Sequence, residues 1–362
     1  VKLRPGLTFH SGNPVTAADV AYSLSRAIKL DKTPAFIIKQ IGWTADNVDD
    51  AVVAVDDSTV EINILADLSP ALVLNLLSSS VASIVDMKEV QSHEVDGDMG
   101  YAWLKDNSAG SGPYKLKTWK ANEVVMLEAF DDYRQGKPAM NRVVIRHVAE
   151  PSAQRLLLEK GDVDAAMELT ADQLKGLSGN ADVSAESYPK GYLMYLASNM
   201  DHPVLSKPEV REALKYMVDY DGMVGSFLDG QYKIHQNFWP SGMWAAATDT
   251  PYSYNMDKAK ALIADAGLDG DTKITIDTLN KSPFTEVAQS VQASVKELGI
   301  DSEIILSDGA TLWPKYRARK HELIVARWGP DYSDPHSNAD AFAHNPDNNF
   351  EAKLTGKLTW RN

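Results

Sequence analysis

Strand and helix patterns alternate in the last third of the chain, between residues 273 and 326. Short runs rich in isoleucine and valine, typical of strands, are separated by segments whose apolar residues recur every three or four positions, as in helices. The pattern predicts strands at 273–277, 304–306 and 323–326, separated by helices at 287–298 and 313–317. Strands joined through helices pair in parallel, because the helix returns the chain to the same end of the sheet. An α/β fold with a largely parallel sheet and helices on its faces is therefore expected.

The first third of the chain has a different, mixed pattern. A helix is expected after Thr16, because Asp19 lies three residues on and completes a variant capping box. A hairpin at 52–64 and a second β pair at 114–127 follow, each with a short polar turn. Helices followed by paired strands in this order favour an α+β subdomain with antiparallel strands.

The middle of the chain connects these two patterns. We expect a strand at 143–145, a helix capped by Ser152 and ended by Gly161, a short strand at 163–167 and a buried strand at 193–196. Two more helices are expected, one starting at Pro208 and one capped by Asn255 and closed by Gly267.

A chain of 362 residues is too long for one compact core, so two lobes are expected. We assign residues 1–140 to a mixed α+β subdomain of the first lobe and residues 141–200 to the rest of that lobe with the first crossover. Residues 201–362 form the second lobe, truncated at its C-terminal end. Both ends read as cut within an element, at 1–9 and at 358–362, so we expect a fragment of a longer protein, in which an absent signal peptide carries no information.

Composition excludes several classes of function. The formal net charge of −14 argues against binding to nucleic acid, since nothing would offset phosphate repulsion. The chain has no cysteine, which excludes disulfides, thiolate catalysis and cysteine metal sites. The most apolar window, 71–85, is too short to span a bilayer.

The loop after the last predicted strand offers a candidate binding site. Trp328, Asp331 and Asp334 follow the strand directly, and ligands bind at the carboxyl ends of strands in open α/β sheets. Asp331 can pair with a ligand cation while the Trp328 ring packs against the ligand body. The alternative reading is that the two aspartates form turns and the tryptophan belongs to the core.

Catalytic and metal signatures are weak. The chain lacks the Gly-x-Ser-x-Gly, Gly-x-x-x-x-Gly-Lys and His-Glu-x-x-His motifs. Asp331 and Asp334 resemble a glycosidase carboxylate pair, but such groups usually face each other across a cleft rather than share one loop. His336 and His344 flank Asp340 and are the closest histidine pair, for which solvated loop positions are the favoured reading.

Seven short motifs resemble those of the family 5 extracellular solute-binding proteins, the peptide and nickel receptors of ABC importers. In family order they lie at 9–24, 110–114, 131–138, 161–164, 208–214, 257–263 and 328–335. One departure is Arg134, where relatives usually carry tryptophan. Any one motif is weak evidence, but seven in the same order over nearly the whole chain are specific.

The resemblance implies the type II periplasmic-binding-protein fold in its large form, with an additional subdomain in the first lobe and ligand enclosed between the lobes. It implies that Asp331 pairs with the ammonium group of a peptide and that Trp328 lines a side-chain pocket, with Gly329 between them in the same motif. It further implies that Trp313 supplies an aromatic wall and Arg317 a cation for the ligand carboxylate, although one or both of Arg317 and Arg319 could instead be solvated. Arg317 is preferred to Arg319, because it lies one helical turn from Trp313. The loop at 237–244, which carries Trp244, borders the cleft in relatives.

The expected function is that of a periplasmic or membrane-tethered extracellular receptor, without catalysis, cofactor or metal. It would capture a short peptide as a monomer and deliver it to the membrane subunits of an ABC permease. Two alternatives stay open. The same scaffold could bind a nickel chelate, an opine or a sugar, or the protein could be a hydrolase that uses Asp331 and Asp334.

Overall fold

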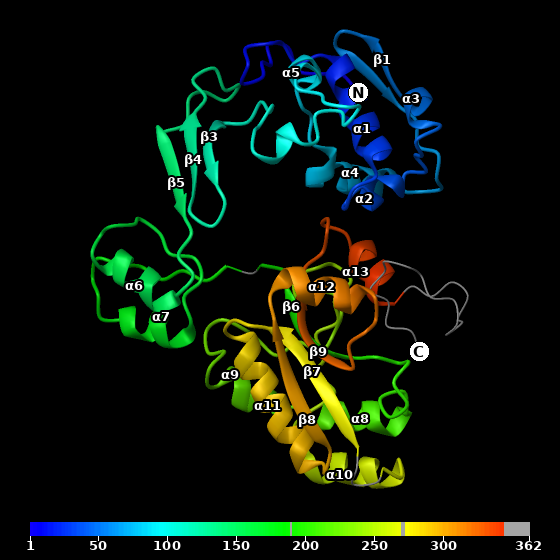
Figure 1. Cartoon of the computed structure of the whole chain (residues 1–362), viewed down its shortest axis with the longest axis vertical. Helices are drawn as coiled ribbons and strands as arrows, with labels where there is room; N and C mark the ends of the chain where they lie inside the picture. The colour runs from blue at the N-terminus through cyan, green and yellow to red at the C-terminus, as the bar shows by residue number, and fades with distance from the viewer. Residues whose placement is uncertain (189, 269–271, 344–362) are drawn as a thin grey trace. The chain divides into compact units, whose positions relative to one another are not determined.

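The computed structural model describes residues 1–188, 190–268 and 272–343. The chain forms two compact units, Val1–Val148 and Ala149–Asn362 (Figure 1). The sequence-based subdivision at residues 140 and 200 stays a prediction. His344 and the segment 358–362, on which two expectations rest, lie outside the described residues. Among the described residues, no helix has the length and hydropathy required to cross a membrane.

The first unit combines short helices with two small antiparallel sheets. Its helices and strands are α1 (Ala17–Leu30), α2 (Phe36–Lys39), α3 (Val48–Ala51), β1 (Val52–Asp56), β2 (Thr59–Ile62), α4 (Pro70–Leu77), η1 (Ser80–Ala82), α5 (Met87–Ser92), η2 (Trp103–Lys105), β3 (Tyr114–Lys120), β4 (Val124–Ala129) and β5 (Arg142–Arg146). The strands pair as β1-β2 and as β3-β4-β5. The predicted hairpin and β pair are both present.

A buried carboxylate organises the opening motif of this unit. Asp86 is 1% exposed, and its side chain accepts hydrogen bonds from Ser11 Oγ (2.6 Å) and Asn13 Nδ2 (2.8 Å). The same carboxylate caps α5. The predicted start of α1 is also confirmed, because the Asp19 carboxylate accepts the backbone N–H of Thr16 at 2.8 Å. The motif residues at 9–24 therefore hold the fold of the first unit together.

The second unit contains a mixed four-stranded sheet with helices packed against it. Its elements are α6 (Pro151–Glu159), α7 (Ala171–Leu177), β6 (Leu193–Ser198), α8 (Pro208–Tyr216), α9 (Tyr220–Val224), α10 (Met256–Asp265), β7 (Lys273–Leu279), α11 (Phe284–Glu297), β8 (Asp301–Ser307), α12 (Gly309–Arg317), β9 (Leu323–Trp328) and α13 (Pro335–Phe342). The strand order is β6-β9-β7-β8. β7 pairs in parallel with β8 and β9, whereas β6 pairs antiparallel to β9.

The core of the second unit confirms the alternating pattern. β9 is the buried centre of the sheet, with Leu323, Ile324, Val325 and Ala326 all 0% exposed. The stripe predicted for α11 packs in the same core, and Val291 and Val295 of that stripe are 2% and 0% exposed. Parallel pairing places the carboxyl ends of β7 and β9 at one edge of the sheet, which is where the Trp328 loop begins.

Three details of the middle segment differ from expectation. α6 begins at Pro151, with Glu150 as N-cap, because proline suits the first helical position, so Ser152 lies inside the helix and does not cap it. Residues 163–167 are not a strand, since no neighbouring described segment supplies the ladder of hydrogen bonds. β6 exists as predicted, but it is a half-buried edge strand rather than a buried one.

Candidate ligand-binding site at the end of strand β9

The loop after β9 is held by helix α13, which follows it. The backbone N–H of Asp331 donates to Ser337 Oγ at 2.8 Å. Asp334 is the N-cap of α13, and its Oδ1 accepts the backbone N–H of His336 at 2.9 Å. The Trp328 ring packs against Phe342 at the end of the same helix, with ring centroids 4.9 Å apart. The Asp334 side chain therefore shapes the loop, whereas Asp331 takes part in this arrangement through its backbone N–H.

Asp331 is an exposed carboxylate in the loop after β9, and one side of it borders protein. The side chain keeps solvent-accessible surface, yet the surrounding atoms displace water and raise the pKa of the Asp331 carboxyl, an effect that the positive charge of Arg317 partly offsets. Among the described residues, no lysine, arginine or histidine nitrogen lies within 4.0 Å of its oxygens. Such a carboxylate gains when an ammonium group arrives, because a charge-assisted hydrogen bond replaces lost hydration.

Helix α12 carries two further predicted site residues, Trp313 and Arg317. Asp308 caps the helix by accepting the Thr311 N–H at 2.8 Å, and the Trp313 indole lies over Gly309, where a Cβ would approach Nε1 to 3.2 Å. Trp313 is half-buried and Arg317 is exposed. Arg317 influences the pKa of Asp331, so these two residues share one electrostatic environment.

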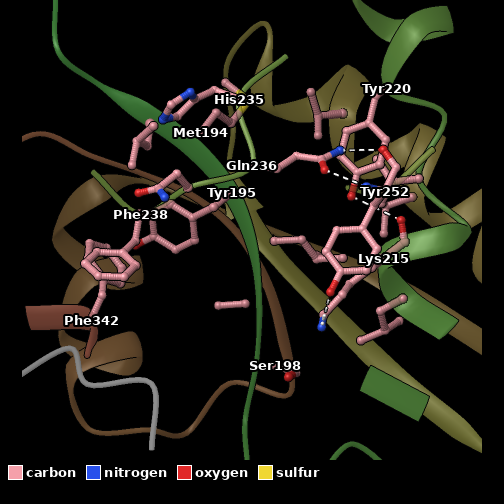
Figure 2. Close-up of a pocket in the computed structure, with 18 of the residues that line it drawn as sticks. Met194, Tyr195, Ser198, Lys215, Tyr220, His235, Gln236, Phe238, Tyr252 and Phe342 are labelled. Carbon is pink, nitrogen blue, oxygen red and sulfur yellow. Dashed lines mark hydrogen bonds between the residues drawn. The ribbon is translucent and has the colours of Figure 1, made fainter. Parts of the chain in front are cut away.

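A cavity of about 830 Å³ lies within the second unit, with Phe342 of α13 in its wall (Figure 2). It is bounded by β6, by α8 and α11, by the segment 232–238 and by Phe342. Its volume lies within the range of small-molecule pockets, and its wall combines apolar and polar side chains. None of the six predicted site residues lines it. Phe342 connects the two regions, since it contacts Trp328 outside the cavity and Tyr195 within it, the latter at 5.4 Å between ring centroids.

Tyrosine hydroxyls supply much of the polarity of the cavity wall. Tyr195 Oη and Tyr316 Oη lie 3.2 Å apart, and burial raises the pKa of Tyr195 well above its usual range and that of Tyr316 to about 12. Burial likewise raises the pKa of Tyr220 to about 12. Lys215 Nζ donates to Tyr252 Oη at 3.0 Å (Figure 2). Tyr195, Tyr316 and Tyr220 therefore stay neutral phenols at physiological pH and act there as hydrogen-bonding groups.

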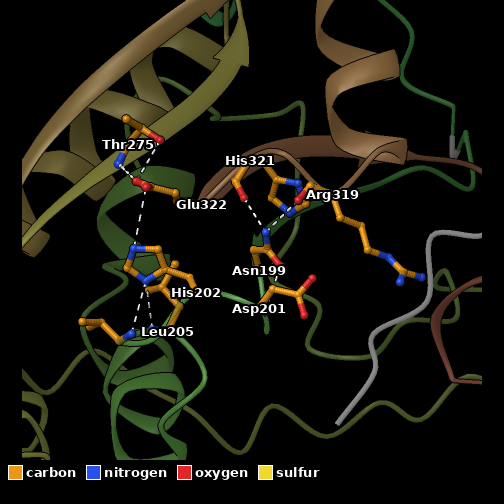
Figure 3. Close-up of polar contacts among 9 residues, drawn as sticks. Asn199, Asp201, His202, Leu205, Thr275, Arg319, His321 and Glu322 are labelled. Carbon is orange, nitrogen blue, oxygen red and sulfur yellow. Dashed lines mark hydrogen bonds and ion pairs between the residues drawn. The ribbon is translucent and has the colours of Figure 1, made fainter. Parts of the chain in front are cut away.

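A polar turn that forms part of the cavity wall connects β6 to the α12–β9 junction (Figure 3). Asn199 Nδ2 donates to the carbonyl oxygens of Arg319 (2.9 Å) and His321 (2.8 Å). Glu322 accepts the Thr275 hydroxyl at 3.0 Å and pairs with His202 at 3.6 Å. This network fixes the entry into β9, and with it the position of the loop at the other end of the strand.

The predicted site residues do not all lie together. Trp328, Gly329 and Asp331 share the loop after β9, and Trp313 and Arg317 lie on α12. Trp244 is 81% exposed and lies away from the cavity wall. In its loop, Phe238 lines the cavity and Trp239 Nε1 donates to the Pro335 carbonyl at 2.9 Å.

Several residues around the cavity were not predicted from sequence. Tyr195, Tyr220 and Tyr252 come from separate segments, and only the tertiary structure brings them together. Tyr195 belongs to the apolar run 193–196, which was predicted as a strand. Its hydroxyl group within that run was the sequence signal that could have pointed to a cavity wall.

Metal ligands are not grouped in the described residues. No cluster of three or more histidines, aspartates or glutamates is placed to hold an ion there. His336 Nδ1 lies 2.8 Å from Tyr332 Oη. Its proposed partner His344 lies outside the described residues, so that pairing stays untested.

Comparison with known proteins gives one consistent family. The chain is 30% identical over 336 residues to the probable D,D-dipeptide-binding periplasmic protein DdpA of Escherichia coli K12, covering 92% of this chain and 63% of DdpA. It is 26% identical to the glutathione-binding protein GsiB of Pectobacterium atrosepticum, covering 85% of this chain and 57% of GsiB. The chain thus spans less than two thirds of the length of these curated relatives.

The fold matches solved periplasmic binding proteins. The periplasmic binding protein DppA from Helicobacter pylori, solved with the peptide STSA, superposes with a TM-score of 0.80 at 23% identity, covering 93% of this chain and 67% of that one. This likeness supports the type II periplasmic-binding-protein fold inferred from the motifs. The family model of the bacterial extracellular solute-binding proteins, family 5 Middle, matches residues 1–350. The chain belongs to family 5 of the bacterial extracellular solute-binding proteins.

Proposed function

We propose that this protein is the receptor of an ABC import system and that it captures a short peptide by its free ammonium group. The observation that carries the proposal is Asp331, a partly desolvated carboxylate at the end of β9 with no cation within 4.0 Å among the described residues. A positive ligand group there restores the stabilisation that water would otherwise provide. Relatives described as binding dipeptide and glutathione support a peptide as the solute.

The neighbouring residues have defined parts in this proposal. Trp328, packed against Phe342, offers an apolar surface beside the ammonium group. Arg317 on α12 attracts the ligand carboxylate, since its charge already acts on Asp331 from a distance. The receptor is proposed to be periplasmic and monomeric, to bind no nucleic acid and to deliver its ligand to the permease subunits in the membrane.

Binding without turnover is part of the proposal. A hydrolase that used the aspartates of this loop would require two available carboxylates, but the Asp334 carboxylate accepts a backbone N–H as the N-cap of α13. Mass spectrometry of Ala-Ala after prolonged incubation with the protein checks this point. We expect the dipeptide to be recovered intact, and release of alanine would contradict a receptor function.

Calorimetric titration with a matched set of ligands tests the ammonium anchor. We expect Ala-Ala to bind and N-acetyl-Ala-Ala to bind at least tenfold more weakly, a loss of about 1.4 kcal/mol. Asp331→Asn should weaken Ala-Ala to a similar extent and leave the acetylated peptide unaffected. Asp249→Asn, at an exposed aspartate of a distant loop, is the control. Ala-Ala affinity in the Asp331→Asn variant equal to that of the wild-type protein would remove Asp331 from the site.

A further inference from the structure

Tyr192 lies directly beside the candidate site, immediately before β6. The antiparallel register pairs Leu193 with Trp328 and Met194 with Arg327, so the next position along the pair places Tyr192 opposite Gly329. A Cβ on Gly329 would lie 2.3 Å from Cε1 and 2.4 Å from Cδ1 of the Tyr192 ring. The ring therefore rests on the Gly329 backbone, in space that exists only because residue 329 has no side chain.

A cation holds this ring from the strand side. The guanidinium carbon of Arg327 lies 4.8 Å from the centroid of the Tyr192 ring and 5.8 Å from that of Phe284. Phe284 is 1% exposed and forms the first turn of α11, so one of the two rings is fixed by the core. Arg327 is half-buried and lies close enough to Tyr232 to influence the pKa of its hydroxyl. Cation–π contacts of this kind stabilise ring orientation when the cation is partly desolvated.

No carboxylate competes with these rings for the Arg327 guanidinium in the part of the chain that the structure describes, where none lies within 4.0 Å. A guanidinium with a carboxylate partner would be oriented by that partner. Arg327 is instead held by two aromatic rings and by the nearby Tyr232 hydroxyl, and it covers the ring of Tyr192.

Tyr192 is nevertheless 50% exposed. A tyrosine ring clamped by a guanidinium and a glycine backbone, yet half in contact with solvent, presents a rigid apolar surface. Such a surface binds other apolar groups at a low cost in conformational entropy, because the ring is already ordered. Gly329 and Asp331 lie in one loop two residues apart, so this surface adjoins the carboxylate.

We infer that Tyr192 is a specificity-determining residue of the proposed peptide site, whose ring takes an apolar side chain of the ligand, and that Arg327 and Gly329 position the ring. This inference rests on the proposed function, because it needs a peptide anchored at Asp331. It adds a preference among peptides that Asp331 alone does not provide, since every free peptide has an ammonium group.

The test is a comparison of three dipeptides, Ala-Ala, Phe-Ala and Ala-Phe, titrated into the full-length protein and its variants. The wild-type protein should bind one of the phenylalanine peptides at least fivefold more tightly than Ala-Ala. Tyr192→Ala should abolish this preference with little change in Ala-Ala affinity, and Tyr192→Phe should keep it. Tyr192→Leu, which keeps apolar area without a flat ring, should retain only part of it. Thermal melting of each variant shows whether it is folded, and half-exposure of the ring predicts small changes.

A double-mutant cycle tests the positioning roles. Gly329→Ala should reduce the preference in the wild-type background, because the new methyl group displaces the ring, but should have no further effect on the preference in the Tyr192→Ala background. Arg327→Met should reduce the preference in the same background-dependent way.

The outcomes separate this inference from the function on which it rests. If the wild-type protein binds all three peptides equally, or if Tyr192→Ala keeps the preference, the inference is wrong and the receptor function stands. If the wild-type protein binds none of the three, the proposed function is wrong and the inference falls with it. Additive effects of Gly329→Ala and Tyr192→Ala would remove the positioning role of Gly329.

Discussion

At the scale of single residues, Asp331 links binding to stability. Its pKa is raised in the folded protein, mainly by desolvation, so the folded state takes up a proton more readily than the unfolded state. The contribution of Asp331 to the free energy of unfolding is then fully present at pH values below the ordinary aspartate pKa. It is lost as the pH rises through the raised pKa of the folded state. At neutral pH the charged carboxylate therefore destabilises the unliganded fold.

We predict that Asp331→Asn makes the unliganded protein more stable at pH 7, although it weakens binding. The gain should be modest, about a few tenths of a kcal/mol, because the side chain keeps contact with solvent. Urea unfolding at pH 7 and pH 3 measures it. At pH 3, where the aspartate is largely protonated, the two proteins should converge, and a less stable variant at pH 7 would contradict this account.

His321 has the opposite effect on the dependence of stability on pH. It is 5% exposed, and burial, aided by the charges of Lys315 and Arg319, lowers its pKa to about 4. The unfolded state takes up a proton near the ordinary value of 6.5, whereas the folded state does so only near pH 4. The contribution of His321 to the free energy of unfolding is therefore fully present above pH 6.5 and is lost as the pH falls from 6.5 toward 4.

We predict that His321→Phe makes the free energy of unfolding depend less on pH between pH 6.5 and pH 4. The wild-type protein should lose on the order of 3 kcal/mol of unfolding free energy between pH 7 and pH 4 through this residue. The phenylalanine keeps a ring against Tyr316, which contacts the histidine edge-to-face at 4.8 Å, but it does not titrate. Chemical denaturation across the pH range gives the slopes, and the exposed His147→Gln is the control. An unchanged slope in the His321→Phe variant would exclude the residue as the source.

At the scale of elements, local sequence signals predicted which helices and strands form better than they predicted how deeply each one is buried. The alternation of β7, α11, β8, α12 and β9 followed from apolar spacing. The preceding helix α10 followed also from its cap, because the Asn255 side chain accepts the Lys258 N–H at 2.9 Å. The pairing of β6 could not be predicted in this way, because an apolar edge strand beside a cavity has the same composition as a buried one. The segment 163–167 had strand composition, but pairing partners are a tertiary property.

An ion pair ties helix α12, which carries Trp313 and Arg317, to the sheet. Lys315 Nζ lies 2.5 Å from Asp277 Oδ1 on β7, and Asp277 is 0% exposed. Its Oδ2 has no hydrogen-bond partner among the described residues. The pair therefore fixes the register of the helix over the strand while leaving the aspartate dependent on a single cation.

We predict that Lys315→Met destabilises the protein by on the order of 3 kcal/mol, because it leaves an uncompensated buried carboxylate. The double variant Asp277→Asn with Lys315→Met should recover most of this loss, since the buried charge is then absent. Urea denaturation of the four proteins of the cycle measures the coupling between the two residues. Losses that simply add would show that the ion pair does not hold α12.

At the scale of the whole molecule, the binding residues come from parts of the chain that sequence spacing cannot bring together. The loop after β9 was recognisable, because a carboxylate and an indole at the end of a buried strand form a local pattern. Tyr192 and Arg327 were not, since their contact depends on the antiparallel register between β6 and β9. The wall formed by Tyr195, Tyr316 and Phe342 likewise depends on the packing of three distant segments.

Net charge belongs to this scale as well, and it predicts how ligands approach. With a formal charge of −14, the chain attracts cationic solutes before any contact forms. The association rate of Lys-Ala, with a net charge of +1, should therefore fall several-fold as ionic strength rises, because salt screens the attraction over distances beyond about 10 Å. Glu-Ala, with a net charge of −1, should associate faster at high salt, and neutral Ala-Ala should change little.

Stopped-flow measurement of tryptophan emission follows these reactions, since Trp328 lies beside the proposed anchor, and Trp328→Phe identifies its share of the signal. Dissociation rates should respond much less to salt, because they depend on short-range contacts at Asp331. Identical salt dependence for the three dipeptides would show that the charge of the whole molecule does not steer the ligand. In that case the raised pKa of Asp331, and the lack of a cation within 4.0 Å of it in the described part of the chain, would have to explain recognition of the ammonium group by local contacts alone.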